Sequence, residues 1–235
     1  MNLLYTLSVV ASVLLVACGS GSGTGESPTQ PYSDFTKIKS VPVTKGSFTD
    51  PRDGKTYKTV TIGSQTWMAE NLNYMPSRCY DDDPLNCELY GGLYDQSAAE
   101  KACPEGWHLP GGKYRGDEWK VLIETLDENN KPEECGSSVN GSGGIIACGE
   151  VVQGLKSSSG WATENGSDLY GFSILPAGEY SYFMKVYMNA GLKTEFWIIG
   201  PTGRSSVWVG KESEKWIVRE TGAVLSDISV RCVKN

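Results

Sequence analysis

Cysteine usage constrains this chain more than any other feature. Seven cysteines stand among 235 residues, and the first, Cys18, directly follows an apolar N-terminal run. The other six are even in number, which is typical of three disulfides in an exported chain. A zinc site is disfavoured, because the chain has no C-x-x-C pair and its only histidine is His108.

Six cysteines allow many pairings, and the sequence alone does not choose among them. Our preferred set consists of two short local clips, Cys79–Cys87 and Cys135–Cys148, and one long closure, Cys103–Cys232. The long closure would enclose more than half of the chain. It would therefore remove the most conformational entropy from the unfolded state, worth about 5 kcal/mol in the loop-entropy treatment.

Residues 1–18 predict a lipoprotein signal. Residues 3–16 are apolar but too few for a comfortable membrane span. They end in small residues before Cys18, as in a lipobox, although no Lys or Arg precedes the apolar run. An ordinary secretory signal is the alternative. We expect a lipid anchor on Cys18 that holds the protein in a bacterial cell envelope, at the outer membrane or cell surface.

Residues 19–49 are expected to form a tether and an edge segment ahead of a folded domain at residues 50–235. The tether is rich in Gly, Ser, Thr and Pro, which is typical of flexible linkers. The formal net charge is −7, and no basic cluster is present. Because nucleic-acid binding needs a basic face, nucleic acid is excluded as a partner.

Hydrophobic periodicity predicts two helices, at residues 95–102 and 117–127. The second carries an apolar stripe formed by Trp119, Leu122, Ile123 and Leu126. Alternating patterns and turn residues predict strands at residues 56–62, 172–175, 181–187, 195–199, 206–209, 215–219 and 228–233. Residues 129–160, rich in Gly and Ser, are expected to form a loop stapled by its two cysteines.

Several segments together resemble the Fibrobacter succinogenes major paralogous domain family, in the family's order. They are KTVTIGSQTWMAENLNY at 58–74, YGGLY at 90–94, ACPEGWHLP at 102–110, DEW at 117–119, GFSILPAG at 171–178, FW at 196–197 and SVRCVK at 229–234. The resemblance covers residues 50–235. It implies an α+β, C-type-lectin-like domain with two helices, short antiparallel strands and long disulfide-stapled loops, in which the first and last strands pair.

Aromatic residues near the C-terminus are the candidates for ligand contact. Tyr180, Tyr182, Tyr187 and Trp208 are expected at the surface, where aromatic rings stack on sugars or enter protein interfaces. Four tryptophans at family positions are expected in the core: Trp67, Trp107, Trp119 and Trp197. The favoured function is a non-catalytic cell-surface domain that binds a glycan or a protein partner.

Two alternatives remain open: an extracellular enzyme acting on polymers or peptides through carboxylates such as Asp117 or Glu118, and a structural envelope protein. His108 is expected to be structural, with its ring satisfied by a backbone carbonyl, because no nucleophile stands at a recognisable spacing from it. Three consecutive acids are weak calcium candidates, and a solvated loop is favoured, since they lack the spacing of an EF-hand. They are Asp81, Asp82 and Asp83. No other cofactor is expected.

Overall fold

The computed structural model describes residues 41–111, 117–129, 131, 135, 144–200, 203–212, 215–222 and 224–235. The predicted signal, the lipidation site Cys18 and most of the tether lie outside these residues. Among the described residues, no helix has the length and apolar character needed to cross a membrane.

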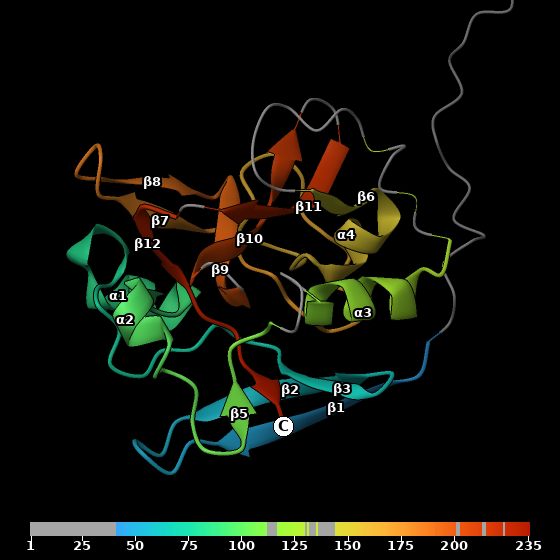
Figure 1. Ribbon diagram of the computed structural model, residues 1–235, viewed down its shortest axis with the longest axis horizontal. Helices are drawn as coiled ribbons and strands as arrows, with labels where there is room; N and C mark the ends of the chain where they lie inside the picture. The colour runs from blue at the N-terminus through green and yellow to red at the C-terminus, as the bar shows by residue number, and fades with distance from the viewer. Residues whose placement is uncertain are drawn as a thin grey trace, which may run out of the picture. The chain divides into compact units, whose positions relative to one another are not determined.

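A five-stranded sheet brings the beginning and the end of the domain together (Figure 1). Its order is β1 (Val43–Thr49), β2 (Thr56–Ile62), β3 (Gln65–Met68), β13 (Val233–Lys234) and β5 (Trp107–His108). Strand β2 matches the predicted range. The final strand pairs with β3 through Val233 and Trp67 and with β5 through Val233 and His108. The resemblance implied that the first and last strands pair, but β2 and β3 lie between β1 and β13.

A larger sheet contains most of the C-terminal half. Its order is β4 (Leu93–Tyr94), β12 (Ser226–Ser229), β7 (Ala177–Ser181), β9 (Lys193–Gly200), β10 (Gly203–Glu212), β11 (Lys215–Gly222) and β6 (Ile145–Cys148), and β8 (Val186–Ala190) pairs with β7. Three strand predictions were wrong. Within residues 181–187, positions 182–185 form the turn of the β7–β8 hairpin, and residues 172–175 contribute only an isolated bridge between Lys156 and Ile174. The strand predicted at residues 228–233 is divided between β12 and β13.

The described residues contain four α-helices: α1 (Pro84–Tyr90), α2 (Gln96–Ala99), α3 (Asp117–Leu126) and α4 (Glu150–Leu155). Helix α3 follows the prediction, and its four stripe residues are fully buried where it packs against β2 and β6. Helix α2 is shorter than predicted. Helices α1 and α4 were missed, because six or seven residues are too few to show a helical period. The α+β class predicted from the sequence is confirmed.

Two apolar clusters fill the domain. In the larger one, the rings of Trp67 and Trp119 lie 5.1 Å apart and Phe172 packs against both. The smaller cluster includes Tyr94, Trp107 and Trp197. All four tryptophans expected in the core are buried.

Three disulfides join the six cysteines in the preferred pairing. Cys79–Cys87 closes 8 positions, Cys135–Cys148 closes 13, and Cys103–Cys232 closes 129. The long bridge attaches the turn before β5 to the segment before β13. It therefore reinforces the pairing of these two strands in the small sheet.

Candidate functional site

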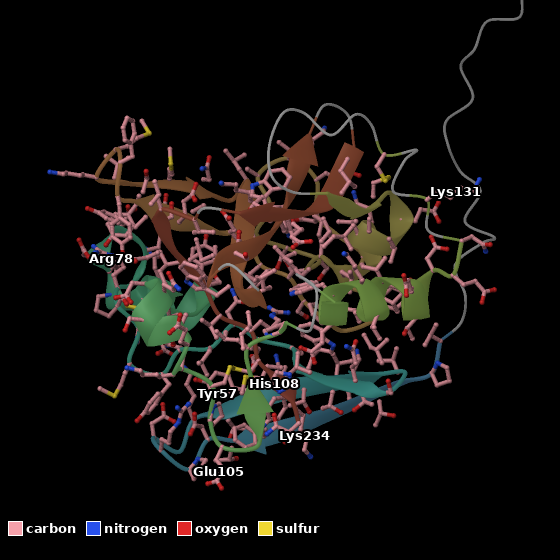
Figure 2. All side chains as sticks on the ribbon, in the orientation of Figure 1. Tyr57, Arg78, Glu105, His108, Lys131 and Lys234 are labelled. Atoms are coloured by element: carbon pink, nitrogen blue, oxygen red, sulfur yellow. A yellow bond between two sulfur atoms is a disulfide. The ribbon has the colours of Figure 1, made fainter. Side chains whose placement is uncertain are left out.

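Three of the four predicted ligand-contact residues meet at the β7–β8 hairpin. The ring of Tyr180 lies 5.0 Å from that of Tyr187 and 5.9 Å from that of Tyr182. The Arg78 guanidinium covers the ring of Tyr180, with its Cζ 3.9 Å from the ring centroid. Figure 2 shows Arg78 at the end of the domain where α1 and α2 lie.

Hydrogen bonds hold the outer two tyrosines in place. The Tyr182 hydroxyl donates to the buried carboxylate of Asp227, which also pairs with Arg78, and the Tyr187 hydroxyl donates to Asp82. Burial and the bond to Asp227 raise the pKa of Tyr182, so its hydroxyl stays protonated at neutral pH. Tyr180 and Tyr187 are partly buried, whereas Tyr182 keeps 43% of its surface exposed.

A pocket of about 390 Å³ opens beside Tyr182. This volume lies within the usual range for small-ligand sites, roughly 300–1,000 Å³. Its lining combines aromatic, apolar and polar side chains: Asp95, Gln96, Ser97, Glu100, Tyr182, Trp197, Val224, Leu225 and Ser226. Such a lining offers the exposed ring of Tyr182 together with several hydrogen-bonding groups.

The polar wall of the pocket comes from α2 and the cap residues at its two ends. Asp95 caps this helix by accepting from the Ala98 amide at 2.9 Å, and its second oxygen accepts from Ser77 Oγ at 3.1 Å. Glu100 accepts from the Gln96 side-chain amide at 2.9 Å. Short-range bonds therefore hold both carboxylates in place.

The aromatic wall comes from two separate strand regions. Trp197 of β9 donates from its indole nitrogen to the Tyr94 carbonyl at 2.7 Å, which fixes its ring. The Tyr182 amide donates to the Leu225 carbonyl at 3.1 Å, which joins the hairpin to the segment before β12. Both aromatic residues are therefore fixed before any ligand arrives.

The tip of the same hairpin exposes apolar side chains. Phe183 is 89% exposed and Met184 57%. Lys185, in the left-handed backbone region at φ 58°, ends the loop by donating its amide to the Ser181 carbonyl. The tip is therefore an apolar projection next to the pocket.

Trp208 does not join this group. It lies on β10 opposite Glu195 of β9, and β9 separates β10 from β7 in the sheet. It is half-buried, and its ring covers Gly210. The position of Trp208 therefore argues against a shared ligand surface with the three tyrosines.

The ring of His108 has side-chain partners, which corrects the expected backbone carbonyl. Nδ1 lies 2.6 Å from Asn235 Oδ1, and Nε2 lies 3.0 Å from Glu118 Oε1. Glu118 also accepts from the Gly111 amide at 2.8 Å. This cluster joins α3, β5 and the C-terminal residue. Glu118 is therefore engaged in holding elements together, and the side chain of Asp117 lies outside the described residues.

The acidic loop is exposed, and its side chains do not converge. Asp83 caps α1 by accepting from the Leu85 amide at 2.9 Å, and Asp82 accepts from Tyr187. In the part of the chain that the structure describes, no group of three or more His, Cys, Asp or Glu side chains is arranged to hold a metal ion.

Sequence reasoning missed most of the pocket. Asp95 was expected only as the first residue of the helix predicted at residues 95–102, and Trp197 only as a core residue. The segment after β11 carries no motif, so Val224 and Leu225 gave no signal. One useful sign was present: Tyr182, Phe183 and Met184 are three consecutive large apolar residues, which the alternation of a half-buried strand does not produce.

Comparison with known proteins bears on the whole domain. Comparison with curated proteins and with solved structures gave no match. The profile of the Fibrobacter succinogenes major domain matches residues 60–234, most of the chain. That match covers both sheets from within β2 to β13, the three disulfides and the pocket. The chain therefore belongs to the Fibrobacter succinogenes major domain family.

Proposed function

We propose that this protein is a non-catalytic, lipid-anchored surface domain that binds a glycan in the pocket between α2 and the β7–β8 hairpin. One observation carries the proposal: the pocket is lined by Tyr182, which is 43% exposed, together with the polar residues Asp95, Gln96 and Glu100. Aromatic rings stack on the apolar faces of sugars, and carboxylates and amides accept and donate hydrogen bonds to sugar hydroxyls.

The cell-envelope location and the C-type-lectin-like fold are parts of the same proposal. The apolar N-terminal run and Cys18 support the lipid anchor. The pairing of β3 with β13 and the long disulfide support the lectin-like reading, because both bring the ends of the domain together.

Calorimetric titration of the full-length protein with a panel of neutral oligosaccharides tests the glycan site. Tyr182→Ala is expected to weaken binding about tenfold, because an aromatic contact is lost. Tyr182→Phe keeps the ring and should retain most of the affinity. If every oligosaccharide fails to bind the unaltered protein, the glycan proposal is wrong.

A protein partner is the second candidate, and the exposed apolar hairpin tip favours it. Aromatic residues and methionine are enriched in protein interfaces. Phe183→Ala distinguishes the two, because Phe183 is not among the residues that line the pocket. Loss of a pulled-down partner in Phe183→Ala but not in Tyr182→Ala would favour the protein interface. Loss of oligosaccharide binding in Tyr182→Ala but not in Phe183→Ala would favour the glycan site.

The enzyme alternative has less support from this pocket. Its two carboxylates, Asp95 and Glu100, are the N-cap and C-cap residues of one short helix, and the Asp95 side chain already accepts from the Ala98 amide. Glycosidases place their two carboxyl groups on opposite sides of the scissile bond. The hypothesis of polymer hydrolysis requires two carboxylates that face each other across the pocket. The described lining residues do not provide such a pair.

A further inference from the structure

The pocket wall carries net negative charge. Asp95 and Glu100 contribute two carboxylates, and none of the described lining residues is basic. Neutral groups donate hydrogen bonds to both carboxylates: an amide and a hydroxyl to Asp95, and a side-chain amide to Glu100. Neutral donors orient a carboxylate without cancelling its charge.

The nearby guanidinium of Arg78 does not offset this charge. It pairs with the carboxylate of Asp227, which is fully buried beneath Tyr182, and it lies over the ring of Tyr180. The positive charge of Arg78 is therefore neutralised by Asp227, which is not one of the residues that line the pocket. The wall of the pocket keeps its own two negative charges.

The aromatic wall suits a cation as well as a sugar. Tyr182 is nearly half exposed, and the face of a tyrosine ring attracts ammonium groups. A carboxylate pair beside an exposed ring is a favourable setting for a protonated primary amine. The same pair repels an anionic sugar, because like charges disfavour each other at short range.

From this arrangement we infer that the pocket selects glycans that carry a free primary amine over their N-acetylated and uronic-acid counterparts. This inference rests on the proposed glycan site and names its ligand class. The amine takes its ionic contact from Asp95 and Glu100, while the sugar ring stacks on Tyr182.

The test compares three sets of oligosaccharides of equal length at pH 6: glucosamine oligomers, N-acetylglucosamine oligomers and galacturonic acid oligomers. The amine oligomers are expected to bind about tenfold more tightly than the acetylated ones, and the acidic ones not measurably. Raising the salt from about 0.05 M to about 0.5 M should remove most of this preference, because exposed charges are screened.

Two charge-matched variants locate the effect. Glu100→Gln is expected to weaken binding of the amine oligomers about threefold and to leave the acetylated oligomers unchanged. Glu105→Gln removes the same charge from an exposed residue at the turn before β5, which lies at another part of the domain from Arg78 (Figure 2), and should change neither affinity.

The outcomes separate the two proposals. Equal affinity for the amine and acetylated oligomers overturns the amine selectivity and leaves the glycan site standing. Absence of binding by all three sets overturns the glycan site itself. Binding of spermidine as tight as that of the amine oligomers would show recognition of the amine alone, which supports the charge argument and contradicts a sugar-specific site.

Discussion

Arg231 and Asn71 stand 160 positions apart and are joined in the core, where Nη2 and Nε of the arginine lie 2.5 and 3.2 Å from Asn71 Oδ1. Arg231 is fully buried, and it also donates to the carbonyls of Phe172 and Ser173. Burial lowers its pKa to about 9. One side chain thus ties the first, fifth and last of the family-like segments together.

Asn71→Ala is expected to lower the free energy of unfolding by about 3 kcal/mol, because removing one partner leaves a buried charge with fewer hydrogen bonds. Urea unfolding of the disulfide-intact protein measures this loss. Asn129→Ala, at an exposed position, serves as the control and should stay within about 0.5 kcal/mol of the unaltered protein. Equal losses in the two variants would contradict a stabilising role for the Arg231 contact.

The long and short disulfides should differ in their contribution to stability. Replacing Cys103 and Cys232 by Ala opens a loop of 129 positions and is expected to cost about 5 kcal/mol. Replacing Cys79 and Cys87 opens 8 positions and is expected to cost about 2.5 kcal/mol. Thermal unfolding of the two double variants shows which disulfide contributes more to stability. A larger loss for the short clip would show that strain or local structure, rather than loop entropy, governs these bridges.

Lys156 should make stability depend on alkaline pH. Its side chain is buried, it donates to the Glu164 carbonyl at 2.6 Å, and burial lowers its pKa to about 7. Below pH 7 the lysine is protonated in both states, and the folded protein bears the full cost of the buried charge. Between pH 7 and about 10.5 the folded state has lost the proton while the unfolded state keeps it. The free energy of unfolding therefore rises with pH across this window.

Lys156→Met is expected to flatten that rise, and Lys101→Met, at an exposed position, is expected to keep it. Urea titrations at pH 6.5, 8 and 9.5 compare the three proteins. Parallel pH profiles for the unaltered protein and Lys156→Met would mean that Lys156 keeps its ordinary pKa in the fold.

Gly178 connects the tyrosine hairpin to the clip around α1. Its φ is +68°, and an added Cβ would lie 2.6 Å from the Ala190 amide nitrogen and 2.8 Å from the ring of Tyr80. Gly178→Ala is expected to cost about 3 kcal/mol, from backbone strain and displaced backbone. Gly106→Ala has a similar φ of +81° and open space around the added Cβ, so it should cost only about 1 kcal/mol. Urea unfolding of both variants measures the two losses in free energy of unfolding. Similar losses would contradict a steric contribution from Ala190 and Tyr80 at position 178.

The sequence by itself determined the local secondary structure of much of this protein. The stripe of Trp119, Leu122, Ile123 and Leu126 allowed α3 to be predicted, because helical spacing places these residues on one face. Alternation located β2, and turn residues separated most of the later strands. The even number of cysteines after Cys18 indicated three disulfides, but the count alone did not select the pairing. Helical spacing, strand alternation and the two short cysteine spacings depend on nearby residues, so a single sequence carries them.

Tertiary structure alone decided where the pocket lies and which aromatic residues share it. Tyr182 faces α2 because its amide bonds to Leu225 across a strand pairing that no local pattern encodes. Trp208 looked equivalent in sequence, but the strand order put β9 between it and the hairpin. The partners of Arg231 and His108 also come from distant segments. Strand order and long-range contacts depend on how the whole chain packs, and a period of two or of 3.6 residues contains no information about them.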